Sequence, residues 1–489
     1  MVHHNAELSP SGPSAPQDPR LFALVSSAVS EALPLLRQII AEGRHIPNRY
    51  PALERSELPN NGFPSFADLI FGNTPDFSRA FGDDEKALIR LDSLRSFTDL
   101  KAYILAHRRF QEFFAAELGL ASTHALRGFV ESRIGYGTAI ELVEMYQVAF
   151  PDCAFSADKL LPLYNRIEER VFAKPIKVEF AVPILCLRFS VSDFSLLDGL
   201  SVRKMPDYLQ HGLAALRHYE SGTHRIVAGA ATHALFVEGT CPNERSTSGL
   251  FTKDEIDYPL EQIDAVFSAL RIMLGVSTGY AQVGVEQASW KELNYPYASR
   301  TQTSQSFRRY PAFFEDGYWL EDVPIIDDKQ LGAVRALLQG DFGNGHFAIA
   351  KRRVNDWALR ERPDDATIDA LIGLESLLSD GQTTELTHKL ALRAAALLSC
   401  CGSATTAADE IFTEIKKIYA YRSTVVHGHD ASKIWRNNFN KTEWGPASAA
   451  YFYLRSVIVA QAANPRFCEA QTIDRELLLG VSHTEDTAR

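Results

Sequence analysis

The spacing of hydrophobic and polar positions divides the chain into two regions. Between residues 21 and 320, apolar residues recur partly at helical spacing and partly in the alternation typical of strands. From residue 328 to 465 they recur almost entirely at helical spacing. The pattern predicts an α+β protein: a mixed α/β N-terminal region, of one or two subdomains, followed by an all-α bundle. We expect residues 1–20 to be a disordered tail and residues 466–489 to be a C-terminal tail.

Local patterns predict the elements of the N-terminal region. A helix is expected from Leu21 with an interruption at Pro34, whereas the Pro-, Asn- and Gly-rich residues 45–83 predict a loop. Residues 85–150 have a mostly helical pattern. β-Branched and aromatic residues then predict strands, and apolar periodicity predicts further helices. The predicted strands cover 176–194 and 225–239, and the predicted helices cover 206–219 and a stretch that starts near Pro259.

The C-terminal region has the clearest periodicity in the chain. Apolar residues recur at three- and four-residue intervals in six stretches, which predicts six helices. These are expected near residues 328–339, 346–361, 366–379, 383–400, 406–427 and 446–462.

Three successive helices of this bundle each carry one charge where an apolar residue is expected. The charged residues are Glu375, Arg393 and Arg422. A buried charge without a partner is costly, so we expect Glu375 to meet one or both arginines inside the bundle. Such a contact would fix the direction of Arg422, as binding of a phosphate requires. A purely structural ion pair is the alternative.

The end of the Arg422 helix adds a second reactive side chain. His427 is expected in the last turn, because Gly428 is a typical residue just beyond a helix end. Histidine moves protons near neutral pH. At about 100° per residue, Arg422 and His427 lie roughly 140° apart around the helix axis. A second copy of the chain would close that gap better than one copy. His429 lies beyond the helix end, where we expect it to be exposed.

Charge around this helix differs from the charge of the whole chain. The chain has 489 residues, a formal net charge of −11 and 46% hydrophobic residues, so nucleic-acid binding through overall charge is not expected. Between Lys416 and Lys441 a single acid, Asp430, accompanies the basic residues. A solvated helix face would also account for this excess. The candidates for RNA binding are Lys416, Lys417, Lys433 and Arg436.

Several other types of chemistry lack the necessary motif. The six cysteines form no C-x-x-C pair, the histidines show no metal-like spacing and no Walker A pattern occurs, so we expect neither a metal nor another cofactor. Free thiols, the absence of an 18-residue apolar run and the absence of a signal peptide predict a cytoplasmic protein without a membrane span. Aromatic and basic residues alternate over 280–320, which suits base stacking or ordinary sheet packing.

The C-terminal region resembles the HEPN superfamily, and within it the Apea-like HEPN group. The resemblance rests on three blocks in order: IDALIGLESLLS around Glu375, ELTHKLALRAAALL around Arg393, and Arg-x4-His in YAYRSTVVHG. It covers residues 330–465. It implies a helical bundle that forms a homodimer, or a higher oligomer, so that two such motifs face each other.

The resemblance also implies metal-independent cleavage of RNA, in which a 2′-hydroxyl attacks the adjacent phosphate. Arg422 would stabilise the phosphate charge and His427 would transfer protons, with Glu375, Arg393 and Ser423 in supporting positions. The family context is prokaryotic antiphage defence or toxin-like RNA degradation, with the N-terminal region sensing an unknown trigger. Two alternatives remain: a non-catalytic HEPN module for binding or assembly, and an enzyme whose chemistry lies in the N-terminal region.

Overall fold

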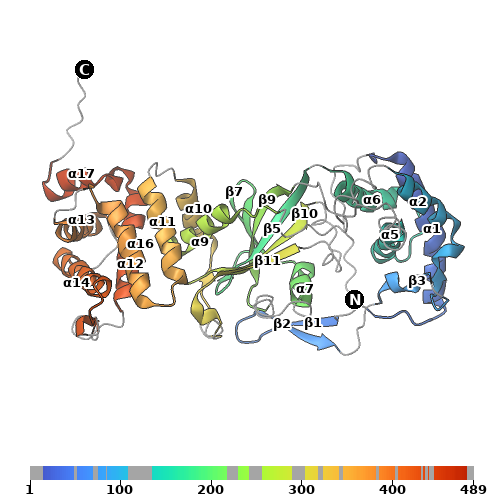
Figure 1. The fold of residues 1–489 in the computed structure, drawn as a ribbon, viewed down its shortest axis with the longest axis horizontal. Coiled ribbons are helices and arrows are strands. Elements are labelled where there is room, and N and C mark those ends of the chain that lie inside the picture. The colour runs from blue at the N-terminus through green and yellow to red at the C-terminus, as the bar shows by residue number, and fades with distance from the viewer. Residues whose placement is uncertain are drawn as a thin grey trace, which may run out of the picture.

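The computed structural model describes most of the chain, and Figure 1 shows an elongated molecule. The helical C-terminal region forms one end, a β-sheet lies in the middle, and the N-terminal helices form the other end. The described residues are 15–48, 52–69, 75–83, 85–107, 135–173, 175–216, 229–241, 256–288, 303–315, 317, 323–340, 345–381, 385–401, 406–430, 433–435, 439 and 445–481.

The centre of the molecule is a six-stranded antiparallel sheet with the strand order β11-β10-β5-β9-β8-β7. Its strands are β5 (Ile176–Pro183), β7 (Asp193–Leu197), β8 (Leu200–Lys204), β9 (His233–Cys241), β10 (Tyr280–Gln287) and β11 (Thr303–Arg309). The strands predicted within 176–194 and 225–239 are thus confirmed in part: β5 and the start of β7 lie in the first range, and β9 begins at His233 in the second. The sheet makes the N-terminal half mixed α/β, as the alternating pattern predicted.

The two faces of the sheet belong to two hydrophobic cores. Val178, Phe180 and Val182 point to one face and pack in the core that continues into the C-terminal bundle. Ala181, between them in the strand, packs in a second core with the N-terminal helices. This alternation follows from the two-residue period of a strand. The sheet is consequently covered on both faces.

The second core is built mainly from helices of the N-terminal region. These helices are α1 (Pro19–Ala41), α2 (Arg95–Ala106), α5 (Gly135–Ala149), α6 (Ala157–Phe172) and α7 (Asp207–Leu216). The predicted interruption at Pro34 is wrong, because α1 runs through this residue without a break. Pro34 is on the exposed side of α1, while Val29, Leu33 and Leu36 are buried. Their packing offsets the roughly 3 kcal/mol that a proline costs inside a helix.

Helix α1 is the one described helix that is long and apolar enough to cross a membrane, judged by length and composition alone. Its most apolar window is 39% buried inside the protein. Buried residues recur along one face, from Leu21 to Ile39, and pack in the second core. The same properties are found in core helices, so this finding is weak support for a membrane span.

The loop predicted for residues 45–83 is also partly wrong. Strands β1 (Ala52–Glu57) and β2 (Pro64–Leu69) form an antiparallel hairpin. The sequence Pro59-Asn60-Asn61-Gly62 forms its turn, where Gly62 adopts φ of 67°. This turn sequence is a hairpin signal, but the short strands around it lack a strong apolar alternation.

Very short elements complete the N-terminal half. They are the parallel pairs β3 (Phe81–Gly82) with β4 (Ile89–Arg90) and β6 (Arg188–Phe189) with β12 (Ile325–Ile326), and the 3-10 turns η1 (Phe77–Ala80), η2 (Leu91–Ser93) and η7 (Ala312–Phe314).

The C-terminal half is helical, as predicted. Its main helices are α10 (Asp328–Gln339), α11 (Gly345–Leu359), α12 (Pro363–Leu378), α13 (Leu386–Cys401), α14 (Ala408–Val426) and α16 (Pro446–Ala463). Their starts follow from local sequence: Asp327 and Gln330 form a capping box, and prolines occupy the first positions of α12 and α16.

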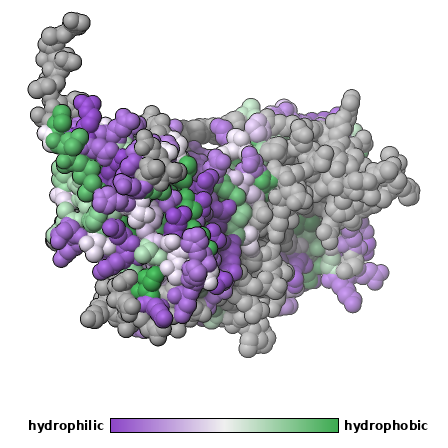
Figure 2. Space-filling model, turned by 60° about the vertical axis from the view of Figure 1, so that its left-hand side comes forward, coloured by the Kyte–Doolittle hydropathy of each residue, from purple (hydrophilic) through white to green (hydrophobic). Residues whose placement is uncertain are grey.

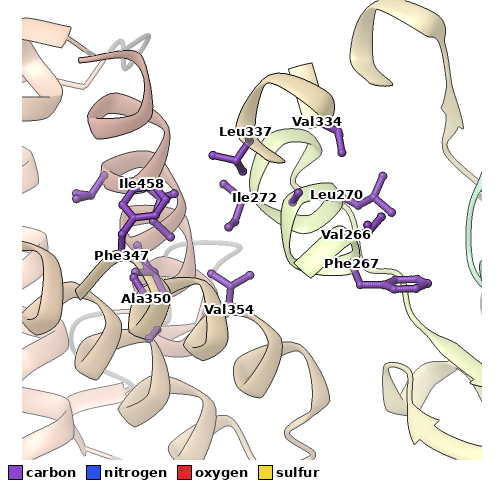
Figure 3. Close-up of a cluster of buried hydrophobic side chains, with 14 of the residues drawn as sticks. Val266, Phe267, Leu270, Ile272, Val334, Leu337, Phe347, Ala350, Val354 and Ile458 are labelled. Atoms are coloured by element: carbon purple, nitrogen blue, oxygen red, sulfur yellow. The ribbon is translucent and has the colours of Figure 1, made fainter. Parts of the chain in front are cut away.

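One continuous core joins the sheet to the bundle. Helix α9 (Leu260–Leu274) lies on the sheet, and its apolar residues belong to the same cluster as those of the bundle helices. Figure 3 shows Ile272 of α9 and Leu337 of α10 facing Phe347 and Ile458 of the bundle. Helix α10 packs mainly against α9 and β7, on the sheet side of this core. Helix α10, with which the bundle was predicted to begin, therefore lies at the junction of the sheet and the bundle and shares their core.

The prediction that residues 466–489 form a C-terminal tail is wrong for the described part of this segment. The short helical segments η9 (Pro465–Cys468), α17 (Ala470–Thr472) and η10 (Ile473–Leu478) follow α16. Phe467 and Ile473 are fully buried, and η10 packs against α13. Residues 465–481 are thus part of the bundle. The end of the expected C-terminal tail, 482–489, and residues 1–14 of the expected N-terminal tail lie outside the described residues. The prediction of a disordered tail up to residue 20 is wrong at its end, because Asp18 caps α1 and the amides of Gln17 and Asp18 donate to Glu168.

Candidate functional site

Helix α14 carries the two residues of the predicted site. Its apolar residues Ile411, Ile415 and Ile418 are buried, and Arg422 follows one turn later on the same stripe. The helix ends at Val426, and His427 is its C-cap residue. The helical stripe therefore directs Arg422 toward the neighbouring helix.

The end of α14 is a Schellman motif. The amide of His429 donates to the carbonyl of Thr424 at 3.0 Å, and the amide of Gly428 donates to the carbonyl of Val425 at 3.0 Å. Gly428 adopts φ of 70°, a left-handed conformation that favours glycine. The predicted helix end is confirmed, and this rigid turn fixes the backbone of His427.

Arg422 is held by one carboxylate. Its Nη1 donates to Oε1 of Glu375 on α12 at 2.8 Å, with 28% of the Arg422 side chain and 22% of the Glu375 side chain exposed. The predicted contact between Glu375 and this arginine is confirmed. Nε of Arg422 is buried and has no hydrogen-bond partner among the described residues, and Nη2 likewise forms no hydrogen bond with them. The guanidinium is thus fixed in direction while donors remain for another acceptor.

Tyr419 is a neighbour of this pair that sequence reasoning missed. It lies one turn before Arg422 and is buried. Burial raises the pKa of Tyr419, and the negative charge of Glu375 raises it further. The phenol therefore stays protonated at neutral pH. Its spacing from Arg422 is the one signal in the sequence that could have identified it.

His427 lies on the surface beside other exposed groups. Its ring centroid is 6.4 Å from that of His429, and both residues are exposed, as predicted for His429. The side chain of His427 forms no hydrogen bond with Arg422, and Val426 next to it is 58% exposed. One copy of the chain therefore presents an open imidazole and a separately held guanidinium.

Arg393 does not contact Glu375, so Glu375 meets one of the two arginines, Arg422, rather than both. Its Nε and Nη2 donate to the two carboxylate oxygens of Asp474 at 2.8 and 2.7 Å. Nη2 also donates to Asp380 at 2.9 Å, and Nη1 donates to the carbonyl of Leu378 at 2.7 Å. The hydrogen bonds to Asp474 raise the pKa of Arg393. This buried arginine fastens the C-terminal segment and the end of α12 to α13.

The other candidate residues surround α14 at different places. Ser423 and Lys416 are exposed, and Lys417 is half-buried. The ammonium of Lys416 lies 5.2 Å from the ring centroid of Phe412 and borders a shallow hollow beside the start of α13. Lys433 is exposed, whereas Arg436 lies outside the described residues.

The bundle end of the molecule has a mostly polar surface, as Figure 2 shows. A few large apolar side chains of this region are exposed nonetheless. These are Leu392, Val426, Leu479 and Val481, which are 39%, 58%, 73% and 48% exposed.

Basic residues from the predicted aromatic and basic stretch are engaged with acids. Arg308 pairs with Glu361 at 2.5 Å, and Arg309 pairs with Asp264 at 2.5 Å. Much of the remaining stretch, including residues 289–302, lies outside the described residues. The described part of this stretch forms the edge of the sheet and packs in the protein. This favours ordinary sheet packing over base stacking.

The described residues contain no group of three or more His, Cys, Asp or Glu side chains that could hold a metal ion. The chain matches no protein-family model, no curated protein and no solved structure.

Proposed function

We propose that the chain is a metal-independent endoribonuclease of the HEPN type. The observation that carries this proposal is the pairing of Arg422 with Glu375 at 2.8 Å, five residues before an exposed histidine on a rigid helix end. An oriented guanidinium stabilises negative charge on a phosphate, and a free imidazole transfers protons.

In the proposed reaction, the RNA 2′-hydroxyl attacks the adjacent phosphorus atom. One imidazole accepts the hydroxyl proton, and a protonated imidazole donates a proton to the departing 5′-oxygen. The products are a 2′,3′-cyclic phosphate and a 5′-hydroxyl end. Arg422 binds the non-bridging oxygens through Nη2, because Nη1 is bonded to Glu375 and Nε is buried.

A homodimer would complete this site. His427 and Arg422 lie far apart around α14 within one copy, and two histidines are needed if one accepts and one donates a proton. The exposed Val426 beside His427, and Leu392 on α13, are apolar residues that a second copy would cover. In this arrangement the N-terminal half senses an unknown trigger, in a cytoplasmic defence or toxin-like role.

The test is cleavage of labelled total RNA and transfer RNA in EDTA by wild type, Arg422→Ala and His427→Ala. We expect each substitution to reduce cleavage by about 10²–10⁴-fold, and wild type to leave 2′,3′-cyclic phosphate ends. His429→Ala is the matched control, because it removes an exposed histidine two residues away and should retain wild-type cleavage. Unchanged cleavage by both site variants would refute the site.

Mixing wild type with His427→Ala tests the composite site. If each site uses both histidines of a dimer, random mixing of equal amounts should leave roughly a quarter of the cleavage given by the same total amount of wild type, because about one dimer in four keeps both histidines. Arg422 and His427 acting within one subunit would leave about half.

A non-catalytic RNA-binding module is the second candidate. It agrees with the same ion pair, because an arginine that Glu375 holds in a fixed direction binds a phosphate whether or not the RNA is then cut. This alternative would be supported if wild type bound RNA without cleaving it, and if Arg422→Ala and His427→Ala lost that binding.

A further inference from the structure

The last turn of α9 is bound by side chains of α16. The last carbonyls of α9, including those of Ile272 and Met273, have no partner within the helix, whereas the carbonyl of Arg271 also accepts from the amide of Gly275 at 3.0 Å. The hydroxyl of Tyr451 donates to the carbonyl of Arg271 at 2.9 Å. Nε and Nη2 of Arg455 donate to the next two carbonyls, those of Ile272 and Met273, at 2.5 and 3.2 Å. Three consecutive carbonyls of the sheet-covering helix are thus held by one bundle helix.

Charge and shape both suit this contact, which we call the α9–α16 clamp. The guanidinium of Arg455 lies at the negative end of the α9 dipole. Gly275 ends α9 with φ of 67°, and a Cβ atom there would lie 2.8 Å from Nη1 of Arg455. The ring of Tyr451 stacks on Trp357 of α11, with centroids 3.9 Å apart and planes 8° apart. The stack fixes the direction of the Tyr451 hydroxyl.

A second connection runs from α9 to α11. Arg271 is 3% exposed, and its side chain donates to the Thr278 carbonyl and to Oδ1 of Asn355. Nδ2 of Asn355 donates back to the carbonyl of Asp264 at 3.0 Å. The clamp therefore sits beside a buried polar network, and α9 cannot slide along the bundle without breaking several buried hydrogen bonds.

Helix α16 also reaches the candidate site. Leu454, adjacent to Arg455, packs against the backbone of α12 at Gly373, where an added Cβ atom would lie 2.8 Å from either methyl group of Leu454. Gly373 precedes Glu375 by two residues, and Glu375 holds Arg422 at 2.8 Å. A shift of α16 would therefore displace α12 and the carboxylate that orients Arg422.

We propose that Tyr451 and Arg455 are positioning residues that couple the sheet to the Glu375–Arg422 pair. A trigger bound in the N-terminal half moves α9, the α9–α16 clamp carries this movement to α16, and the Leu454–Gly373 contact carries it to α12. The consequence for RNA cleavage rests on the proposed function, whereas the mechanical coupling is a property of the fold alone.

Hydrogen–deuterium exchange of the full chain tests the coupling in Arg455→Met and Tyr451→Phe. Loss of the clamp should accelerate amide exchange in the last turn of α9 by about tenfold. The coupling additionally predicts faster exchange over 373–378 and around Arg422. Arg455→Lys keeps a charged donor and should restore exchange partly. Tyr453→Phe is the control, because its hydroxyl donates to Glu414 within the bundle and does not reach α9.

Changes confined to α9 would overturn the proposal. Tyr451→Phe keeps the ring and its stack, so it remains informative if Arg455→Met does not fold. Equal changes at 373–378 in Tyr453→Phe would also overturn it, because they would show a general response of α16. Exchange is measured without RNA, so its outcome stands even if wild type cuts no RNA. If wild type does cut RNA, Arg455→Met should alter the cleavage rate at least threefold, while Tyr453→Phe should not.

Discussion

Two regions of the bundle contain an arginine on an apolar helical stripe, yet their surroundings are opposite. Arg393 is 3% exposed and binds two carboxylates and a backbone carbonyl. The Arg422 side chain is 28% exposed, has one carboxylate partner and keeps Nε without a described acceptor. Periodicity alone cannot separate the two residues.

The difference teaches how to recognise an arginine available for a ligand. A guanidinium has five donors, and Arg393 uses its three nitrogens in four hydrogen bonds to the protein. Its role is to hold α13, the end of α12 and the C-terminal segment together. Arg422 is oriented by Glu375 but not saturated. Orientation together with spare donors is the combination that phosphate binding requires.

Within the comparison of these two regions, the largest expected effect is on stability, at Arg393. Arg393→Met removes a buried cation and leaves Asp380 and Asp474 facing an apolar side chain. We expect a loss of about 3 kcal/mol in the free energy of unfolding, near the lower limit for a broken buried pair, because water can reach Asp474. Its side chain is 35% exposed. Denaturant unfolding followed by far-UV circular dichroism measures this loss.

Arg422→Met is the matched control for that experiment. Arg422 is partly exposed and belongs to a single ion pair, so its removal should lower the free energy of unfolding by no more than about 1 kcal/mol. Equal destabilisation by the two substitutions would show that both arginines are structural, and would remove the main distinction between these regions.

The long periodic helices of the bundle could be predicted from the sequence because one apolar face decides each of them. The helix at 328–339 is predicted to the residue, and the Arg422 helix to within two residues at either end. The helix end at His427 was predictable because it depends on a neighbouring residue: Gly428 adopts the left-handed conformation that commonly ends a helix. These features depend on residues that are close in sequence.

Features set by distant residues could not be predicted. Arg393 and its partner Asp474 are 81 residues apart, and the segment that carries Asp474 consists of helical pieces too short for a periodic signal. The contact of Leu454 with Gly373 is likewise invisible in either helix alone. The continuity of α1 through Pro34 depends on packing against other elements of the N-terminal core.

The next expected effect separates activity from stability at the two carboxylates. Glu375→Gln keeps a hydrogen-bond acceptor for Arg422 but removes the charge that orients it. We expect cleavage to fall by about 3- to 10-fold, mainly in kcat, with less than about 1 kcal/mol lost in unfolding free energy. Single-turnover cleavage and denaturant unfolding measure the two quantities.

Asp380→Asn is the comparison for Glu375→Gln. Asp380 accepts from Arg393 and pairs with Lys389 at 3.7 Å, so its neutralisation should lower stability without changing cleavage. If Asp380→Asn reduces cleavage as strongly as Glu375→Gln, the Arg393 region contributes to the reaction and the two regions are not functionally distinct.

The smallest expected effect concerns lysines rather than arginines, and it extends the comparison to RNA binding. Lys416 is exposed on α14 and forms no ion pair with a described residue, whereas Lys389 pairs with Asp380 beside Arg393. A cation that contacts a backbone phosphate releases a counterion, so its loss weakens binding evenly across RNA sequences. We expect Lys416→Gln to weaken RNA affinity about threefold and to reduce the slope of log affinity against log salt by about one. Lys389→Gln should leave that slope unchanged, because Asp380 already neutralises its charge.

Fluorescence anisotropy with the cleavage-defective His427→Ala chain, from low to moderate salt, measures both slopes. Identical slopes for His427→Ala alone and for His427→Ala combined with either lysine substitution would confine the RNA contact to Arg422. They would exclude the outer face of α14 from the binding surface.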